Sequence, residues 1–431
     1  MEVLSLCSNL DLISPNKETI SLDLAYRKCQ KVKNEIGVSR VGEIGRFVGH
    51  GIYVCQATRP NLFQHFNIGI NTGAQGKGYS RKQAYISAVM EAAENFCAEP
   101  RTPQMIHGSY RELKKHHPIA EPSQFIHRSF KSTIRHDEMI MWSWALHCES
   151  SQQVLIPSEL VYVFHIPELY NDRPIFPSSS AGLAAGFDNY TATMKAISEI
   201  IEQHYRGITE SFDVKIEGLI NDFEVSQLVN KLPSEFNERY ETNFFVISAH
   251  KAKSNIPFVM CFMGDENKFS IGWGLNVDPL KAIQSAHLEA FQSWATQISG
   301  VRENMNTVLD SGPEPKPSRA YLKNFDRVWP DKKTLSSKDF LKRYSTKLLS
   351  EKSEIEILRK FLRENGFDNI YLVNLSREGL SCSVVKAVVP KLSLSLDVHV
   401  APSHLSKLTA DKLVAWQYLI PKPKRSKRLK K

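Results

Sequence analysis

The sequence lacks the features that anchor a protein in a membrane or staple it with disulfide bonds. No run approaches the ~18 apolar residues that a spanning helix needs, and the N-terminus has no basic region followed by an apolar stretch and a small-residue cleavage site. The seven cysteines lie far apart and form no Cys-x-x-Cys pair. These absences argue against a disulfide framework and a structural zinc site, and we expect a cytoplasmic protein without membrane association.

Most of the chain also has no large excess of charge of one sign. Lys and Arg outnumber Asp and Glu by 55 to 46, which gives a formal net charge of +9. Seven of these basic residues fall in the last eleven positions, 421–431, so the basicity belongs to this tail. Because the tail carries no interleaved aromatic residues, nucleic-acid binding is not indicated.

The stretch from Gln75 to Glu94 is rich in glycine and then in alanine. Gly76 and Gly78 favour a tight backbone turn. Ser80, with Gln83 three residues later, has the spacing of a capping box, and the following run contains strong helix formers. The stretch therefore predicts a glycine loop that leads into a helix.

Two acids lie on one face of this predicted helix. Glu91 and Glu94 are three residues apart, and Ser87 lies one turn upstream on the same side. Paired acids on a helix are often simply solvated, in which case no nucleotide would bind. The functional interpretation depends on whether the pattern recurs.

The pattern recurs twice. Residues 180–202 repeat the glycine loop and helix, ending in Glu199 and Glu202 with the same spacing from the last glycine. Residues 272–292 repeat it again, with Asp278 as N-cap and Glu289 in the place of the first acid. Gln292 replaces the second acid in this copy. Three such units indicate a duplicated architecture whose copies converge on one site.

Carboxylates brought together in this way need cations. Oxygen ligands suit Mg²⁺, which takes one or two carboxylates together with substrate phosphates. Glycine loops that lead into helix N-termini offer backbone N–H groups and a favourable dipole to phosphates. The residues therefore predict a site for Mg²⁺ and a nucleotide.

These motifs, in this order, resemble the YcaO family over residues 20–300 and more faintly to about residue 400. The resemblance implies an enzyme that uses ATP and Mg²⁺ to phosphorylate the oxygen of a peptide backbone amide. Attack on the activated carbon by a sulfur nucleophile then gives a thioamide, and attack by a neighbouring Cys, Ser or Thr gives an azoline. It implies that Mg²⁺ is held by Glu91, Glu94, Glu199 and Glu202. It implies that ATP is contacted by Lys77, Ser87, Glu91, Glu202 and Gln292, with no side-chain nucleophile.

The chain departs from the family pattern at three arginine positions. Members commonly carry Arg where this chain has Asn95, Gln203 and Trp294. Lost guanidinium groups remove bidentate phosphate donors. Arg206, Arg81 and Lys77 lie where they could restore positive charge. The alternative is a nucleotide-binding scaffold subunit with impaired turnover.

The kind of product is indicated by the two ends of the chain. Residues 37–61 resemble the start of YcaO proteins associated with the partner protein TfuA and with thioamide formation. Azoline-forming members tend to finish in a proline-rich terminus, which Pro421 and Pro423 resemble only weakly. We therefore favour a thioamide-forming enzyme of ribosomally synthesised peptides and keep an azoline-forming cyclodehydratase as the alternative. The expected partners are a precursor peptide, a TfuA-like or leader-peptide-binding protein, and a second copy of the chain as a homodimer.

We expect an α/β (α+β) body built from the repeated units. The predicted parts are an N-terminal helix and strand region (1–60), a YcaO-like ATP-binding core (61–300), a breaker-rich connector (301–336), a C-terminal part of the core (337–420) and the basic tail (421–431). Residues 351–365 have the periodicity of an amphipathic helix, and 244–249 and 256–263 that of paired strands. Alternatives stay open for two single residues. Arg59 either contacts substrate or phosphate or has a structural role at the end of a strand. Cys97 either handles sulfur or is a small buried residue of the core.

Overall fold

A computed structural model describes most of the chain. The described residues are 12–13, 20–44, 51–60, 73–100, 104–125, 134–163, 172–210, 214–220, 242–249, 256–264, 269–299, 333–348 and 353–392. Most of the predicted connector and the whole basic tail lie outside these residues, and the predicted division into parts remains a prediction.

The described residues form both helices and strands. The helices are α1 (Leu22–Glu35), α2 (Arg81–Cys97), α3 (Tyr110–Leu113), α4 (Asn189–Glu210), α7 (Pro279–Ser299), α9 (Ser337–Leu348) and α10 (Glu354–Glu364), with short 3₁₀ turns at Pro122–Gln124 and Ser158–Leu160. The strands are β1 (Arg40–Glu43), β2 (Tyr53–Thr58), β3 (Gly73–Gly78), β4 (Met105–Ser109), β5 (Met139–His147), β6 (Gln152–Pro157), β7 (Leu183–Gly186), β8 (Val214–Ile220), β9 (Thr242–Ala249), β10 (Phe258–Gly264), β11 (Phe269–Leu275), β12 (Tyr371–Asn374) and β13 (Ser383–Val388). None of the described helices is long and apolar enough to cross a membrane.

The strands make three antiparallel sheets. One has the order β1-β2-β3, a second β11-β10-β9-β8, and the third β4-β5-β12-β13-β7 with β6 paired to β5. The predicted α+β class and the pairing of β9 with β10 are confirmed. Every named strand pair is antiparallel.

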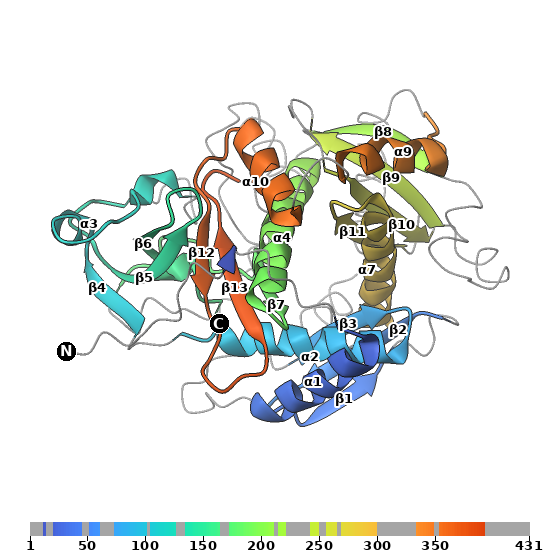
Figure 1. Cartoon of the computed structure of the whole chain (residues 1–431), viewed down its shortest axis with the longest axis horizontal. Coiled ribbons are helices and arrows are strands. Elements are labelled where there is room, and N and C mark those ends of the chain that lie inside the picture. The colour runs from blue at the N-terminus through green and yellow to red at the C-terminus, as the bar shows by residue number, and fades with distance from the viewer. Residues whose placement is uncertain are drawn as a thin grey trace, which may run out of the picture.

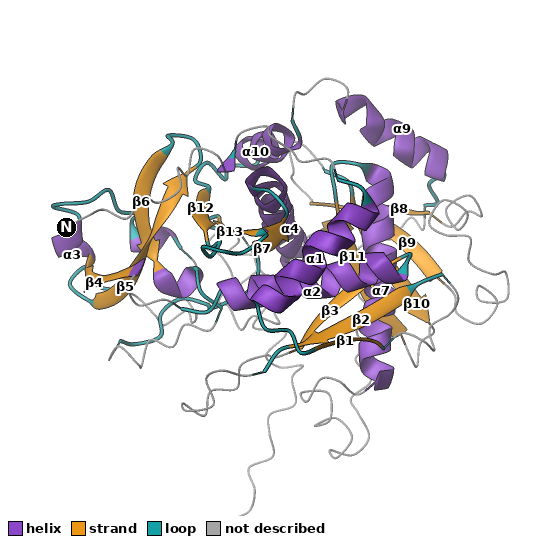
Figure 2. Ribbon diagram, turned by 60° about the horizontal axis from the view of Figure 1, so that its bottom comes forward, coloured by secondary structure: helices purple, strands orange, loops and turns teal. Residues whose placement is uncertain are grey.

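The three repeated units form a closed ring. Each unit is a strand followed by a helix: β3 with α2, β7 with α4, and β11 with α7. Helix α2 also packs against β7, α4 against β11, and α7 back against β3. Figure 1 shows α4 and α7 upright with α2 crossing below them, and Figure 2 shows α1 lying along α2. We call this arrangement the three-unit ring.

Most glycines of the units lie in strands, which corrects the predicted loops; Gly182, with a φ of +76°, lies in the turn just before β7. Gly76 belongs to β3, Gly186 to β7 and Gly272 to β11, and none has a positive φ. A Cβ atom at Gly76 would lie 2.0 Å from the backbone nitrogen of Ala88, and one at Gly272 would lie 2.1 Å from the carbonyl oxygen of Ala286. Glycine is therefore required for close approach of each strand to its own helix, and not for a turn.

The predicted helix starts are confirmed. The Ser80 hydroxyl accepts a hydrogen bond from the backbone N–H of Gln83 at the start of α2. The Asp188 carboxylate accepts from Thr191 N–H (2.7 Å) at the start of α4. Asp278 accepts from Leu280 N–H (2.9 Å) at the start of α7, with Pro279 as the first helical residue. Side-chain caps satisfy backbone donors that the helix leaves free, so they fix where each helix begins.

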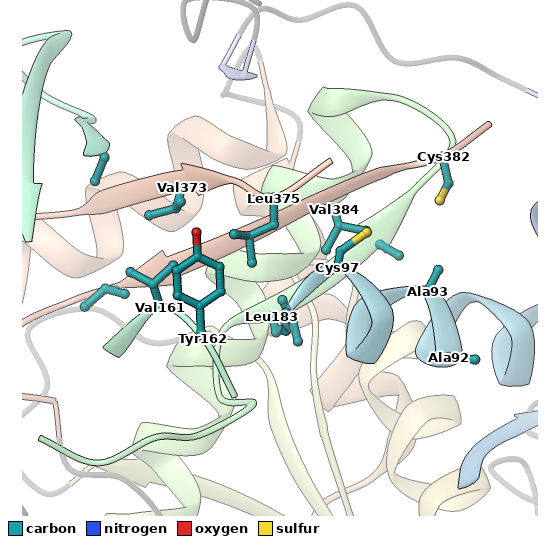
Figure 3. Packing of buried hydrophobic residues seen from close by; sticks show 14 of the residues in the cluster. Ala92, Ala93, Cys97, Val161, Tyr162, Leu183, Val373, Leu375, Cys382 and Val384 are labelled. Atoms are coloured by element: carbon teal, nitrogen blue, oxygen red, sulfur yellow. The ribbon is translucent and has the colours of Figure 1, made fainter. Parts of the chain in front are cut away.

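Cys97 lies at the end of α2 in a hydrophobic cluster where the ring meets the third sheet. The cluster includes Leu183 of β7, Val384 of β13 and Cys382, as Figure 3 shows. All six cysteines in the described part of the chain are buried and free of disulfide bonds. The interpretation of Cys97 as a small core residue is therefore confirmed.

Replacing Gly76 with alanine tests the close approach of β3 to α2. The new methyl group would meet helix backbone, which cannot move aside as a side chain can. We expect the free energy of unfolding to fall by about 3 kcal/mol, in the upper part of the range for overpacked cores. Gly42→Ala is the matched control, because a Cβ atom there meets only the Arg40 side chain at 3.5 Å. Urea unfolding measures both, and equal losses in the two variants would contradict the close-packing account.

Candidate functional site

Hydrogen bonds between neighbouring units close the three-unit ring. The Glu94 carboxylate on α2 accepts from the backbone N–H of Ala185 in β7 (2.7 Å). The Glu202 carboxylate on α4 accepts from the backbone N–H of Leu275 in β11 (3.0 Å). In each case the second acid of one unit binds the strand of the next.

The third junction of the ring, between α7 and β3, explains why the third repeat carries an amide. Gln292 on α7 donates from its side-chain nitrogen to the carbonyl oxygen of Gln75 in β3 (3.2 Å). A carboxylate has no hydrogen to donate to a carbonyl oxygen, whereas an amide does. The hydroxyl of Thr296 reinforces this junction by donating to Gln75 Oε1 (2.6 Å).

The ring gathers the acids of different units into one electrostatic cluster. Burial and the neighbouring charge of Glu91 raise the pKa of Glu94 to about 8, and the charge of Glu199 adds to this shift. Burial raises the pKa of Glu202 to about 8 as well, with the charges of Glu199 and Glu289 adding to it. The pKa of Glu199 is also raised, mainly by burial. Crowded carboxylates with raised pKa values are a common mark of functional sites.

Two basic side chains partly compensate this negative charge. Lys77 of β3 reaches Glu289 with Nζ–Oε2 3.0 Å, and its side chain is only 25% exposed. Arg206 of α4 approaches the other oxygen of Glu289 at 4.0 Å. Both cations lower the pKa of Glu202, opposing the effect of burial. The cluster thus contains more acids than bases.

The structure shows which basic residues near the missing arginines turn toward the site. Arg206 does so, and Gln203 donates a hydrogen bond to Glu199 Oε1 (2.8 Å). Arg81 does not: its guanidinium pairs with Glu43 (3.1 Å), and its side chain is 70% exposed. The expectation that Arg81 restores charge at the site is therefore wrong, because that residue begins α2 at the far end of the helix from the acids.

The donor set fits Mg²⁺ without forming a complete metal site by itself. No three His, Cys, Asp or Glu side chains within the described ranges are placed to hold one ion together. Mg²⁺ usually takes only one or two carboxylates and completes its shell with phosphate oxygens and water. Half-buried carboxylates whose pKa values are raised by burial and by their mutual charge suit such a cation, since it relieves their repulsion.

The sequence predicted no role for two members of this cluster. Glu289 was placed by the repeat at the position of Glu91 and Glu199, and that same repeat was the signal for a role at the site. Lys195 lies one turn before Glu199, donates to the carbonyl oxygen of Ala185 (3.3 Å) and lowers the pKa of Glu94. No spacing signal marked Lys195. Ser87 lies half-buried on α2, one turn before Glu91, as predicted.

Arg59 plays a structural role at the end of β2. Its guanidinium donates to the carboxylate of Glu99, and both side chains are almost fully buried. Arg377 approaches the same carboxylate (3.4 Å), and both arginines lie over the ring of Phe96. The alternative of a substrate contact is not supported, because this guanidinium is already paired inside the protein.

The fold and the cluster define the class of protein: an α+β body whose three strand–helix units surround a group of carboxylates. The model of the YcaO cyclodehydratase family, described as ATP- and Mg²⁺-binding, matches residues 75–393. The chain belongs to the YcaO family, and ATP and Mg²⁺ are the cofactors of that family.

Two relatives and one solved structure extend the comparison. An uncharacterized protein of Methanothermobacter thermautotrophicus is 28% identical over 378 residues, which cover 83% of this chain and 90% of the relative. An uncharacterized protein in the tfuA 3′ region of Rhizobium leguminosarum bv. trifolii is 24% identical over 381 residues, covering 84% and 85%. The structure of YcaO from Methanopyrus kandleri bound with AMPPCP and Mg²⁺ superposes with a TM-score of 0.64 at 20% identity, covering 86% of this chain and 91% of that one. It shows the same fold.

The raised pKa of Glu202 predicts a pH dependence of stability. A glutamate in the unfolded chain titrates near pH 4.3, so between about pH 4.3 and about pH 8 the folded protein keeps a proton that the unfolded chain has lost. The free energy of unfolding, without added metal, therefore falls as pH rises through this window. In Glu202→Gln the amide oxygen still accepts from Leu275, and the fall becomes shallower.

Urea unfolding between about pH 5 and about pH 8 measures this slope. Glu378→Gln is the control, because Glu378 is exposed on the turn before β13. A slope that is the same in the wild type and in Glu202→Gln would show that Glu202 is not held among like charges.

Proposed function

We propose that this protein is an ATP- and Mg²⁺-dependent enzyme that activates a backbone amide of a ribosomally synthesised peptide and converts it to a thioamide. The observation that supports this most strongly is the carboxylate cluster at the centre of the three-unit ring. Its acids outnumber Lys77 and Arg206, which are aimed at them. Such a mixture of acids and cations suits a metal-bound polyphosphate better than either ion alone.

In this proposal the metal ligands come from two of the three helices. Glu91 and Glu94 of α2 and Glu199 and Glu202 of α4 hold Mg²⁺ together with phosphate oxygens. Mg²⁺ supplies neutralisation of the charge on the transferring phosphoryl group. The raised pKa values of Glu94, Glu199 and Glu202 support the proposal, because a bound cation favours the ionised form.

The nucleotide contacts come from all three units. Lys77, Ser87 and Gln292 bind ATP, and Glu91 and Glu202 contact it as well. Arg206 supplies the guanidinium that the family pattern carries elsewhere, and Glu289 holds Lys77 and Arg206 in place until a phosphate replaces it as their partner.

The proposed reaction has two steps, and each step forms one bond and breaks another. The amide oxygen attacks the γ-phosphorus of ATP, and ADP leaves. A sulfur nucleophile then attacks the amide carbon, a C–S bond forms, and the C–O bond breaks as phosphate departs. The protein acts through positioning and charge stabilisation, and no side-chain nucleophile is required.

Two alternatives each have one supporting observation. The matched family model is described as a cyclodehydratase, which favours azoline formation. Asn95, Gln203 and Trp294 in place of arginines favour a nucleotide-binding scaffold subunit. The relative from the tfuA 3′ region favours thioamide formation, and with it a TfuA-like partner. A precursor peptide, a leader-binding protein and a second copy of the chain remain the proposed partners.

The proposal predicts that a cognate peptide stimulates phosphate release from ATP. The test incubates the protein with Mg–ATP, a sulfide source and candidate peptides, and follows phosphate release together with the peptide mass. Exchange of oxygen for sulfur marks a thioamide, and loss of water marks an azoline. Arg206→Met should lower the peptide-stimulated rate roughly a hundredfold or more, because it removes the remaining phosphate-binding guanidinium of the cluster.

Arg173→Met is the control, because Arg173 pairs with Glu138 on another part of the protein. Binding of Mg–ATP without phosphate release, for every peptide that the genomic neighbourhood offers, would contradict the enzyme and support the scaffold.

A further inference from the structure

A small cavity lies between two hydrophobic clusters of the protein. Its volume is about 40 Å³. Its walls come from the turn before β7, from α4, from β13 and from the segments that hold Phe125 and Leu160. These walls are mostly apolar. A space of this volume holds about three water molecules.

The exceptions among the apolar walls are Ser179 and Lys386, and Lys386 of β13 is the charged one. Its side chain is only 2% exposed, although lysine is among the residues least often buried. The ammonium donates to the carbonyl oxygens of Ser179 and Ala181. Within the described ranges no carboxylate forms an ion pair with it. In its charged form the lysine has three hydrogens, so after these two bonds one donor is left for a ligand.

The backbone around Lys386 is held firmly. Gly182 has a φ of +76°, and a Cβ atom there would lie 2.4 Å from the carbonyl oxygen of Ala387. The N–H of Ala387 donates to Gly182 (2.8 Å), and β13 pairs with β7 from Ser383 to Lys386. The turn that supplies both carbonyl partners of Lys386 is thus fixed to the strand that carries it, so the cavity is pre-formed.

We propose that this cavity binds a small carboxylate, of the size of acetate or an aspartate side chain. The carboxylate pairs with the third N–H of Lys386, and its methyl or methylene group lies against the apolar walls. A carboxylate is the ligand that best satisfies a buried ammonium with an unused donor, since the charge-assisted hydrogen bond is strong where water is excluded. The same chemistry fits a free acid and an acidic side chain of a bound peptide. The cavity shares no lining residue with the proposed nucleotide contacts, although the charge of Glu199 also acts on Lys386.

Electrostatics agree with this assignment. Burial lowers the pKa of Lys386 to about 7, and the one charge that opposes the shift is that of Glu199 on α4. A carboxylate in the cavity adds a second and closer negative charge. Binding should therefore return the lysine to its charged form, and the protein should take up a proton as the ligand enters.

Calorimetry of the full chain with sodium acetate at about pH 8 tests the proposal, in two buffers of different ionisation enthalpy. We expect a millimolar dissociation constant and uptake approaching one proton per bound acetate. Lys386→Met should weaken acetate binding roughly tenfold or more and abolish proton uptake. Lys391→Met is the control, because Lys391 is exposed on the turn after β13. Sodium chloride at the same ionic strength controls for salt.

A second variant keeps the test decisive if Lys386→Met does not fold. Ala181→Val adds two methyl groups to a cavity wall and leaves the lysine in place, and it should also abolish binding. A blocked tripeptide with a central aspartate, compared with its asparagine counterpart, distinguishes a peptide side chain from a free acid. The proposal is wrong if the wild type binds neither acetate nor the aspartate peptide, or if binding proceeds without proton uptake.

Discussion

Like charges held together against their repulsion are the constraint on which this structure depends. Glu94 and Glu202 reach the backbone of the next unit, and the two bonds draw acids of neighbouring units into one cluster. The pKa values of both residues are raised, by burial and by the neighbouring carboxylate charges, which means that ionising them in the cluster is unfavourable. Lys77 and Arg206 offset part of that cost, and a metal-bound nucleotide would offset the rest.

Close packing of small residues makes the crowding achievable. Glycines of β3, β7 and β11 let each strand lie directly on its own helix, and alanines on those helices leave room for the approach. Each helix then reaches the strand of the next unit with one glutamate or glutamine side chain. An amide at Gln292 completes the ring, because the atom that it meets is a carbonyl oxygen and not an N–H group. The backbone group that each side chain meets therefore decides whether a junction between units carries a glutamate or a glutamine.

Much of this could be predicted from the sequence, because the repeat is periodic and the caps are local. The three units, their helix starts and the shared face of Glu91 and Glu94 depend on residues within one or two turns. The role of Gly76 could not be predicted, since the residue type is the same for a glycine that makes a turn and for one that lets a helix approach closely. Nor could the directions of Arg206 and Arg81, which depend on partners far away in the sequence.

The central claim is that carboxylates of different units form one site for Mg–ATP. Calorimetric titration of Mg–ATP into the wild type, Glu199→Gln and the surface control Glu378→Gln tests it most directly. Glu199 interacts electrostatically with both Glu94 and Glu202, so its neutralisation should weaken binding at least tenfold while the control binds like the wild type. Equal affinity in all three proteins, or no binding by the wild type, would contradict a converging acidic site.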